Sequence, residues 1–147
     1  MPKYNNFMDE FKFYVPVTVR YSDLDAQWHV NHTRFLIYME QARLGYLQKL
    51  ELFDGKSFLD LRAIIADVHV SYLAPIVLGQ QVRVGTRTSK IGKKSIKFEY
   101  VLEDAETLQP LAKGEVISVA YNFREQVSVS IPQEWRERIS EFEGRSY

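Results

Sequence analysis

The spacing of hydrophobic residues predicts a strand, a long helix and then four further strands. Apolar residues alternate with polar ones from Val15 to Tyr21. Over about residues 33–50 they recur every three or four positions, which places them in one stripe along a helix. The stripe consists of Phe35, Met39, Ala42, Tyr46 and Leu50, widened by Leu36 and Leu47.

From Arg62 onward the spacing of apolar residues changes to two, over four segments that are separated by short turns. The first segment ends before Pro75, and the later ones begin after Gly79, after Gly92 and after residues 106–110. Long strands joined by short turns are typical of a meandering antiparallel sheet. We expect one face of the first segment to carry Ile64, Val68, Val70 and Tyr72.

A short closing helix is predicted over residues 132–142, with Pro132 in its first turn. A single long apolar helix beside a strongly curved antiparallel sheet can be buried when that sheet wraps around it. We therefore expect an α+β fold of the hotdog type, in which a curved five-stranded antiparallel sheet encloses one long central helix. With 147 residues, the chain should form a single domain over residues 1–147.

Gly45 interrupts the helical stripe, at a cost of about 1 kcal/mol relative to alanine in a helix interior. A close approach of the helix to the sheet is one explanation, and a chance glycine that the fold tolerates is the other. The sequence leaves both open.

Composition and charge narrow the function classes. Lys plus Arg and Asp plus Glu both number 19, so the chain has no overall field that would recruit nucleic acid or an anionic membrane. There is no cysteine, which excludes disulfides, thiolate zinc sites and a cysteine nucleophile. No stretch has the length of a membrane span, and residues 1–13 lack the apolar core of a signal peptide. We expect a cytoplasmic protein with no nucleic-acid or membrane partner.

Polar and ionisable residues gather between the first strand and the long helix. Residues 22–32 contain two aspartates, two histidines and an asparagine. Asn31 or Thr33 can cap the helix that follows. Unpaired N–H groups and the helix dipole favour developing negative charge at such a helix start. A carboxylate that faces it can assist a nucleophile while the amides hold an oxyanion, so this segment predicts acyl chemistry.

Residues 15–123 resemble the hotdog-fold thioesterases of the 4-hydroxybenzoyl-CoA thioesterase family. Residues 23–32, with the sequence DLDAQWHVNH, are similar to the family's loop, in which an aspartate precedes His-Val-Asn-Asn at the start of the central helix. Residues 38–43, 72–79 and 92–95 resemble later signatures of the family. The resemblance implies an acyl-CoA thioesterase that forms a homodimer or a dimer of dimers, with active sites at the subunit boundary.

Asp25 is the candidate catalytic carboxylate. The resemblance implies that this aspartate attacks the thioester or activates water, and that backbone N–H groups at the helix start, foremost that of His32, polarise the carbonyl. The alternative is that Asp25 only forms a turn with its own backbone. Asp23, two residues earlier, is expected to be a structural loop residue that bonds nearby backbone.

The sequence departs from the family pattern at two positions of this loop. Trp28 stands where a glycine is common, which adds a large apolar surface at the mouth of the site and leaves the acyl preference open. His32 replaces a second asparagine, but its backbone donor is unchanged. We expect Trp28, His29 and Asn31 to contact substrate, although His29 and Asn31 could instead only orient the loop.

Two other interpretations of these residues are less favoured. His29 and His32 have the spacing of a metal pair, but zinc usually takes three or four protein ligands and His69 is far along the chain. We therefore expect neither a metal nor another cofactor. Glu40, a helix carboxylate, is expected to pair with Arg43 rather than to act as a base.

The basic residues concentrate around one predicted turn, and Ser95 adds a hydroxyl donor there. These cations form either a solvated hairpin tip or a site for the phosphates of coenzyme A, which a few lysines can bind. The resemblance places nucleotide contacts in this part of the sheet, so Lys93, Lys94 and Ser95 are candidate substrate-binding residues. The full set is Lys90, Lys93 and Lys94, with Arg83 and Arg87 upstream.

The sequence thus predicts hydrolysis of an acyl- or aroyl-CoA to free acid and coenzyme A. A thioesterase for acyl carrier protein and a non-catalytic acyl-CoA-binding protein are the alternatives. No dinucleotide, nucleoside triphosphate or serine-hydrolase motif is present.

Overall fold

A computed structural model describes residues 11–53 and 63–147. The predicted strand start at Arg62 lies outside these residues, as do residues 1–10 of the N-terminal segment. The elements, in chain order, are β1 (Tyr14–Thr18), the 3-10 turn η1 (Tyr21–Asp23), α2 (His32–Lys49), β2 (Ala63–Tyr72), β3 (Gln81–Ile91), β4 (Ser95–Asp104), β5 (Pro110–Asn122), β6 (Val127–Ser128) and α3 (Gln133–Glu143).

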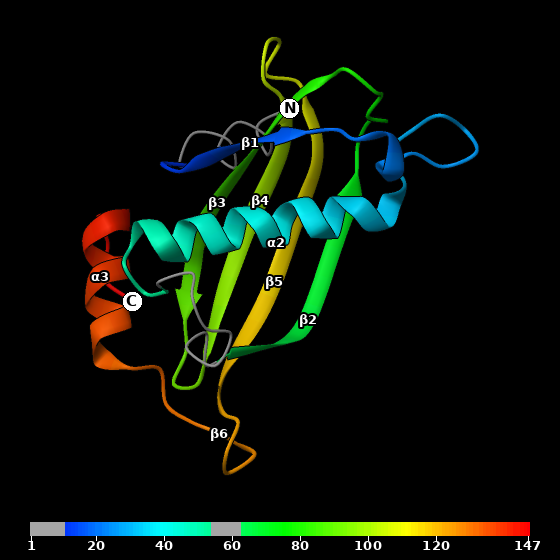
Figure 1. Ribbon diagram of the computed structural model, residues 1–147. Coiled ribbons are helices and arrows are strands. Elements are labelled where there is room, and N and C mark those ends of the chain that lie inside the picture. The colour runs from blue at the N-terminus through cyan, green and yellow to red at the C-terminus, as the bar shows by residue number, and fades with distance from the viewer. Residues whose placement is uncertain (1–10, 54–62) are drawn as a thin grey trace.

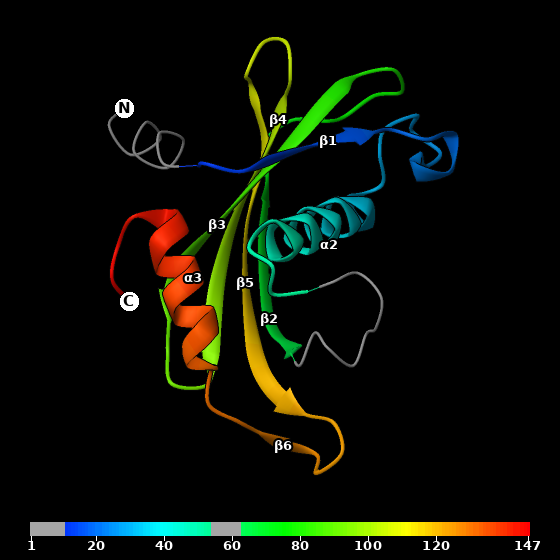
Figure 2. The same cartoon turned by 60° about the vertical axis from the view of Figure 1, so that its left-hand side comes forward.

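One curved antiparallel sheet wraps around α2, which lies across its concave face (Figures 1 and 2). The strand order is β1-β3-β4-β5-β2, and the short β6 pairs with β5. The predicted hotdog fold is therefore confirmed. Only β3, β4 and β5 form the expected meander, because β2 pairs with β5 instead of with β3. β6 was not predicted, since two residues are too few to show a period.

The apolar stripe of α2 faces the sheet, as predicted. Met39 and Ala42 are 1% and 0% exposed, and Phe35, Tyr46 and Leu50 are also buried. The helix is capped by Asn31, whose side-chain oxygen accepts hydrogen bonds from the N–H of Thr33 at 3.0 Å and from its hydroxyl at 2.6 Å. Such a cap satisfies one of the free donors at a helix start.

Two glycines let α2 approach the sheet closely. A Cβ at Gly45 would lie 3.2 Å from Cγ1 of Val15 in β1, so the close approach is the correct explanation for this glycine. A Cβ at Gly114 in β5 would lie only 2.6 Å from Sδ of Met39. The helix therefore packs tightly against the sheet at both places.

A bulge changes the direction of side chains along β2. The register with β5 shifts between Ile65 and Asp67, so Ile65 is on the same face of the sheet as Val68. Ile64 therefore lies on the opposite face, and the prediction that it shares a face with Val68, Val70 and Tyr72 was wrong. A period of two continues only while pairing is regular, and a bulge inserts one extra residue.

β2 is an edge strand with an unusual amount of apolar surface. Its pairing partner in the described part of the chain is β5, and its other edge is unpaired there. Ile64, Ile65, Val68 and Tyr72 are 39–47% exposed. None of the described helices is long and apolar enough to cross a membrane.

The C-terminal helix α3 closes the end of the fold that is distant from the start of α2 (Figure 2). Pro132 is its N-cap residue rather than part of its first turn. Glu143 is buried and accepts a 2.6 Å hydrogen bond from the hydroxyl of Tyr46, so α3 is tied directly to α2. Burial and the negative charge of Glu143 raise the pKa of Tyr46, which keeps this phenol protonated.

Candidate functional site

Residues 24–30, called here the Asp25 hairpin, project from the fold between η1 and α2 (Figure 1). Leu24 pairs with Val30, the N–H of Asp25 donates to the carbonyl of His29 at 2.9 Å, and the N–H of Trp28 donates to the carbonyl of Asp25 at 3.0 Å. The base of the hairpin is anchored by a bond from the N–H of Val30 to the carbonyl of Ile76 at 2.8 Å. The loop is thus a defined hairpin that leads directly into α2.

Trp28 occupies the position of this hairpin that requires a left-handed backbone. Its φ is +62°, which costs a residue with a side chain about 1–2 kcal/mol relative to glycine. The indole is 65% exposed and lies edge-on to the ring of Tyr21, with 6.4 Å between centroids. This geometry explains in physical terms why glycine suits this position and shows that Trp28 is held in spite of a backbone cost.

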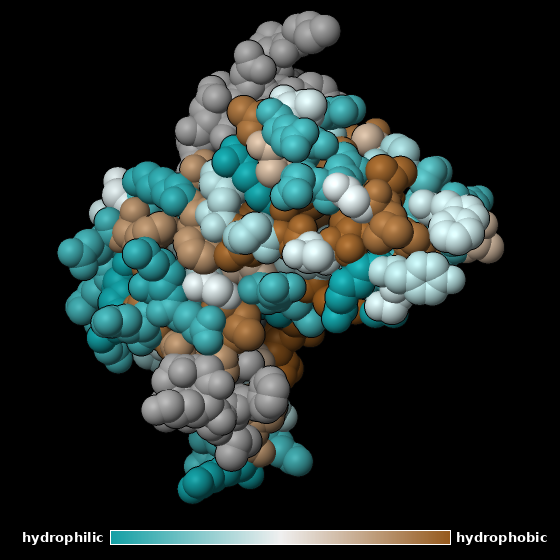
Figure 3. Space-filling model, turned by 45° about the horizontal axis from the view of Figure 1, so that its top comes forward, coloured by the Kyte–Doolittle hydropathy of each residue, from teal (hydrophilic) through white to brown (hydrophobic). Residues whose placement is uncertain are grey.

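Asp25 both stabilises the hairpin and borders an open hollow. Its Oδ1 accepts a 2.9 Å hydrogen bond from the N–H of Gln27, so the turn-forming role is real. In the described part of the chain its Oδ2 has no hydrogen-bond partner. The hollow beside it has a volume of about 450 Å³, and its lining comprises Tyr21, Ser22, Leu24, Asp25, Ala26 and Trp28. Figure 3 shows apolar surface exposed beside this end of the molecule.

Asp23 is buried and joins three parts of the loop, in agreement with the structural role expected for it. Its Oδ2 accepts hydrogen bonds from the N–H of Arg20 at 3.0 Å and from the hydroxyl of Tyr38 at 2.8 Å. Its backbone carbonyl accepts from the N–H of Asn31 at 2.8 Å. Asp23 therefore fixes the hairpin to the side and to the start of α2.

The charge state of Asp23 follows from these contacts. Burial by itself raises the pKa of Asp23, but the hydrogen bonds from Arg20 and Tyr38 and the charges of Arg20 and Arg34 outweigh it, so the pKa is lowered. The two guanidinium groups lie 3.8 Å and 3.9 Å from Oδ1. Asp23 is consequently an anion in the folded protein.

The helix start beside the hairpin carries His32, the first residue of α2. The hydroxyl of Tyr72, at the end of β2, donates a 3.0 Å hydrogen bond to the carbonyl of His32, and the two rings meet edge-on at 6.2 Å. Tyr72 was not identified as a site residue from the sequence, because its contact joins segments that are 40 residues apart. The sequence signal for it was only its position at the end of an apolar strand.

Neither His29 nor His32 belongs to a group of three potential metal ligands among the described residues. His29 is half-buried, and its backbone pairs with that of Val77 in an isolated antiparallel β-bridge. His32 is exposed at the helix start. Within residues 11–53 and 63–147 there is no group of three or more His, Cys, Asp or Glu side chains that could hold a metal ion. Glu40 lies 3.6 Å from Arg43, so the predicted ion pair is confirmed.

The predicted phosphate-binding residues Lys93, Lys94 and Ser95 lie at the opposite end of the sheet from the Asp25 hairpin (Figure 1). The 11 residues of β3 separate the two ends, which corresponds to roughly 35 Å. Lys94 donates to the hydroxyl of Ser128 at 3.2 Å, and the carbonyl of Lys93 accepts from the N–H of Ile131 at 2.8 Å. One chain alone therefore does not bring these residues to Asp25.

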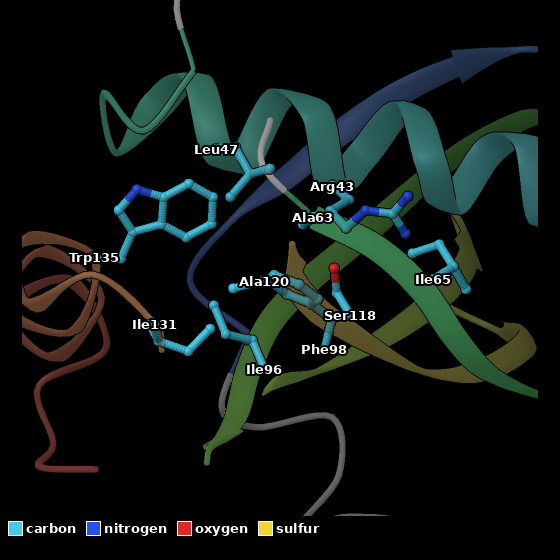
Figure 4. A pocket seen from close by; sticks show the side chains of 10 residues that line it. All are labelled: Arg43, Leu47, Ala63, Ile65, Ile96, Phe98, Ser118, Ala120, Ile131 and Trp135. Carbon is cyan, nitrogen blue, oxygen red and sulfur yellow. The ribbon is translucent and has the colours of Figure 1, made fainter. Parts of the chain in front are cut away.

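A second cavity, not predicted from the sequence, lies between α2 and the sheet (Figure 4). Its volume is about 80 Å³ and its walls are largely apolar. The side chains around it come from α2, from the sheet, from the segment leading into α3 and from α3 itself: Arg43, Leu47, Ala63, Ile65, Ile96, Phe98, Ser118, Ala120, Ile131 and Trp135.

A sequence model of the thioesterase-like superfamily matches residues 19–139, which include the Asp25 hairpin, α2 and the sheet from β2 to β5. The chain belongs to this superfamily. A thioesterase of Thermus thermophilus, solved in complex with coenzyme A and zinc, has 34% sequence identity and a TM-score of 0.82, and the match covers 95% of this chain and 100% of that one.

Two proteins named as acyl-CoA thioesterases are similar to the present chain over most of their length. The acyl-CoA thioesterase YbgC of Haemophilus influenzae is 30% identical over 125 residues, which cover 83% of this chain and 90% of YbgC. The long-chain acyl-CoA thioesterase FadM of Escherichia coli is 24% identical over 131 residues, which cover 85% of this chain and 95% of FadM.

The left-handed backbone at Trp28 predicts an unusual order of stabilities. Trp28→Gly and Trp28→Ala both remove the indole, but only glycine relieves the backbone strain. We expect the glycine variant to have a free energy of unfolding about 1 kcal/mol higher than that of the alanine variant, measured by urea unfolding. An alanine variant as stable as the glycine variant would show that the hairpin relaxes out of this conformation.

The lowered pKa of Asp23 predicts a loss of stability in acid. The folded protein favours the carboxylate, so its contribution is complete above the ordinary aspartate pKa of about 4 and is lost as the pH falls through the lower folded value. Asp23→Asn should be less stable than the natural chain at neutral pH, and the difference should shrink below about pH 4. Urea midpoints measured over a pH series test this, with the exposed Glu106→Gln as control. A difference in urea midpoint between Asp23→Asn and the natural chain that stays constant over the pH series would contradict the lowered pKa of Asp23.

Proposed function

We propose that the protein is an acyl-CoA thioesterase in which Asp25 and the start of α2 carry out the chemistry. The observation that carries the proposal is the Asp25 hairpin. It holds a carboxylate beside a hollow, with one oxygen that bonds to none of the described residues, and it continues directly into the N-terminus of α2. Membership of the thioesterase-like superfamily and the relative that binds coenzyme A support it.

The reaction replaces the acyl–sulfur bond by an acyl–oxygen bond. Asp25 either attacks the thioester carbon, with departure of the coenzyme A thiolate and later hydrolysis of the acyl-aspartate, or removes a proton from the water that attacks. In both cases the carbonyl oxygen gains negative charge, and the backbone N–H of His32 donates to it. Incorporation of ¹⁸O from water into the Asp25 carboxylate during a single turnover would demonstrate the covalent route, because this label requires attack of water on the aspartyl carbonyl of the acyl-aspartate.

Substrate contacts are assigned to both sides of the reacting bond. Trp28 lines the hollow beside Asp25, and we assign His29 and Asn31, later in the same loop, to substrate contact as well. Lys93, Lys94 and Ser95 are assigned to the phosphates of coenzyme A. Because the latter group is roughly 35 Å of strand from the hairpin in one chain, it would serve the active site of another copy. The cytoplasmic location stays a prediction.

The unpaired edge of β2 supports a homodimer. Four exposed apolar side chains and a free row of backbone groups lie on this strand in the described part of the chain, and symmetric pairing with a second copy would cover them. Tyr72, at the end of the same strand, bonds to the first residue of α2. Such a dimer would therefore place the start of α2 at the subunit boundary. A dimer of dimers is compatible with this arrangement.

Asp25→Asn should reduce kcat about 100-fold or more, because the amide keeps the size of the side chain but loses its charge and basicity. Thiol release from acyl-CoAs of short, medium, long and aromatic acyl groups, and from an acyl carrier protein, is the assay. Glu40→Gln is the matched control, since Glu40 is 62% exposed and paired with Arg43, and it should retain activity. Near-normal turnover by Asp25→Asn would refute the assignment.

Replacing Lys93 and Lys94 together by alanine should raise KM for acyl-CoA by several fold and leave kcat nearly unchanged. Phosphates far from the reacting bond interact equally in the ground state and the transition state. Lys49→Ala, an exposed lysine at the end of α2, is the control. The assignment fails if the double variant loses kcat at an unchanged KM.

The active protein should have at least twice the chain mass of 17.2 kDa. Val68→Lys, which places a charge on an exposed apolar side chain in the middle of β2, should lower the mass and the activity together. Light scattering combined with thiol release measures both. A fully active species of 17.2 kDa would overturn the shared site.

A further inference from the structure

The lining of the cavity beneath α2 includes the hydroxyl of Ser118. Ser118 is 6% exposed and lies on the inward face of β5, where its neighbours along the strand are Val116 and Ala120. Its Oγ has no hydrogen bond to any of the residues that the structure describes, and it points into the cavity (Figure 4). The hydroxyl faces the open space of the cavity, so a polar group that enters this space can form a hydrogen bond with it.

A guanidinium faces the same space. Arg43 and Ser118 both line the cavity, and in Figure 4 the Ser118 hydroxyl points up toward α2 while the guanidinium of Arg43 extends above it on the side of Ile65. Arg43 donates to the hydroxyl of Tyr100 at 3.3 Å and lies 3.6 Å from the carboxylate of Glu40. Because a guanidinium has five N–H donors, these two contacts leave it free to bind a further oxygen.

The surroundings of these two groups limit what can enter. The rest of the lining is mainly aliphatic and aromatic, and the volume of about 80 Å³ corresponds to about five water-sized groups. Burial raises the pKa of Tyr100 to about 12, so this phenol does not neutralise Arg43. The cavity thus accepts an apolar chain and offers two donors to an oxygen at its end.

The cavity also lies where an acyl chain could reach it. Ala63 and Ile65, at the beginning of the exposed edge strand, form part of its lining, whereas Tyr72, at the other end of that strand, bonds to the start of α2. Symmetric antiparallel pairing of β2 would bring the end of one strand opposite the beginning of the other. The helix start of one copy would then face the cavity of the next.

We infer that this Arg43–Ser118 cavity receives the far end of the acyl group and selects chains that end in an oxygen, as a hydroxyl or a carboxylate, over plain hydrocarbon chains. The inference rests on the proposed thioesterase function and adds a substrate class to it. Ser118 and Arg43 are specificity residues here, distant from the bond that is cleaved.

Binding of thioether analogues tests the inference without any turnover. S-alkyl coenzyme A compounds with plain, ω-hydroxy and ω-carboxy chains, matched in length from butyl to hexadecyl, are titrated into the natural protein by calorimetry. At the best length the oxygen-bearing chains should bind about tenfold more tightly than the plain chain, as expected for one added hydrogen bond. Plain chains that bind equally well or better at every length would overturn the inference.

Two variants assign the effect to the cavity. Ser118→Ala should abolish the advantage of the hydroxy chain and leave Kd for the plain chain unchanged, and Arg43→Met should do the same for the carboxy chain. Ser130→Ala, an exposed serine outside the cavity, should change nothing. If the advantage survives in Ser118→Ala and Arg43→Met, the inference is wrong.

Thermal unfolding separates this role from a structural one. Removal of an unpartnered hydroxyl should leave the Tm of Ser118→Ala equal or higher. A lower Tm together with equal Kd values for all chains would assign Ser118 to a structural water and overturn the inference. If hydrolysis depends on Asp25 but plain and oxygen-bearing chains bind equally well, only this inference is refuted. End-group selectivity in binding without Asp25-dependent hydrolysis would refute only the proposed function.

Discussion

The architecture depends on burying the apolar stripe of α2 against one antiparallel sheet. That sheet has to curve around α2, and close contact is possible only where the sheet or the helix lacks a side chain. Gly45 and Gly114 supply these places, against Val15 and Met39 respectively. One face of α2 is packed against the sheet in this way, and the polar loop that carries Asp25 directly precedes the start of the helix.

The charge and hydrogen bonds of Asp23 then order the loop at the start of α2. The carboxylate of Asp23 is buried, ionised and bonded to backbone on one side and to Tyr38 of α2 on the other. Asp23 forms ion pairs with Arg20 and Arg34. Asp25 is the carboxylate of the loop that faces the hollow. The two aspartates are two residues apart in sequence, yet one organises the loop and the other remains available for chemistry.

Local periodicity was sufficient to predict α2, the long strands and the hotdog fold, and the loop motif was sufficient to identify Asp25 as a candidate. Features that depend on pairing between distant segments could not be predicted. The bulge after Ile65, the contact of Tyr72 with the helix start and the cavity around Ser118 all arise from strand register, which has no local signature. The positive φ of Trp28 could not be predicted for a different reason, since a tryptophan gives no sequence signal of a left-handed backbone.

The exposed edge of β2 also has a consequence for the life of the chain before assembly. In the part of the chain that the structure describes, a freshly folded monomer presents a strand with an unpaired edge and exposed apolar side chains, which is a template for any other extended chain. Correct pairing competes with aggregation, and both reactions accelerate with concentration. The yield of soluble protein should therefore depend on synthesis rate and temperature more than on the intrinsic stability of the domain.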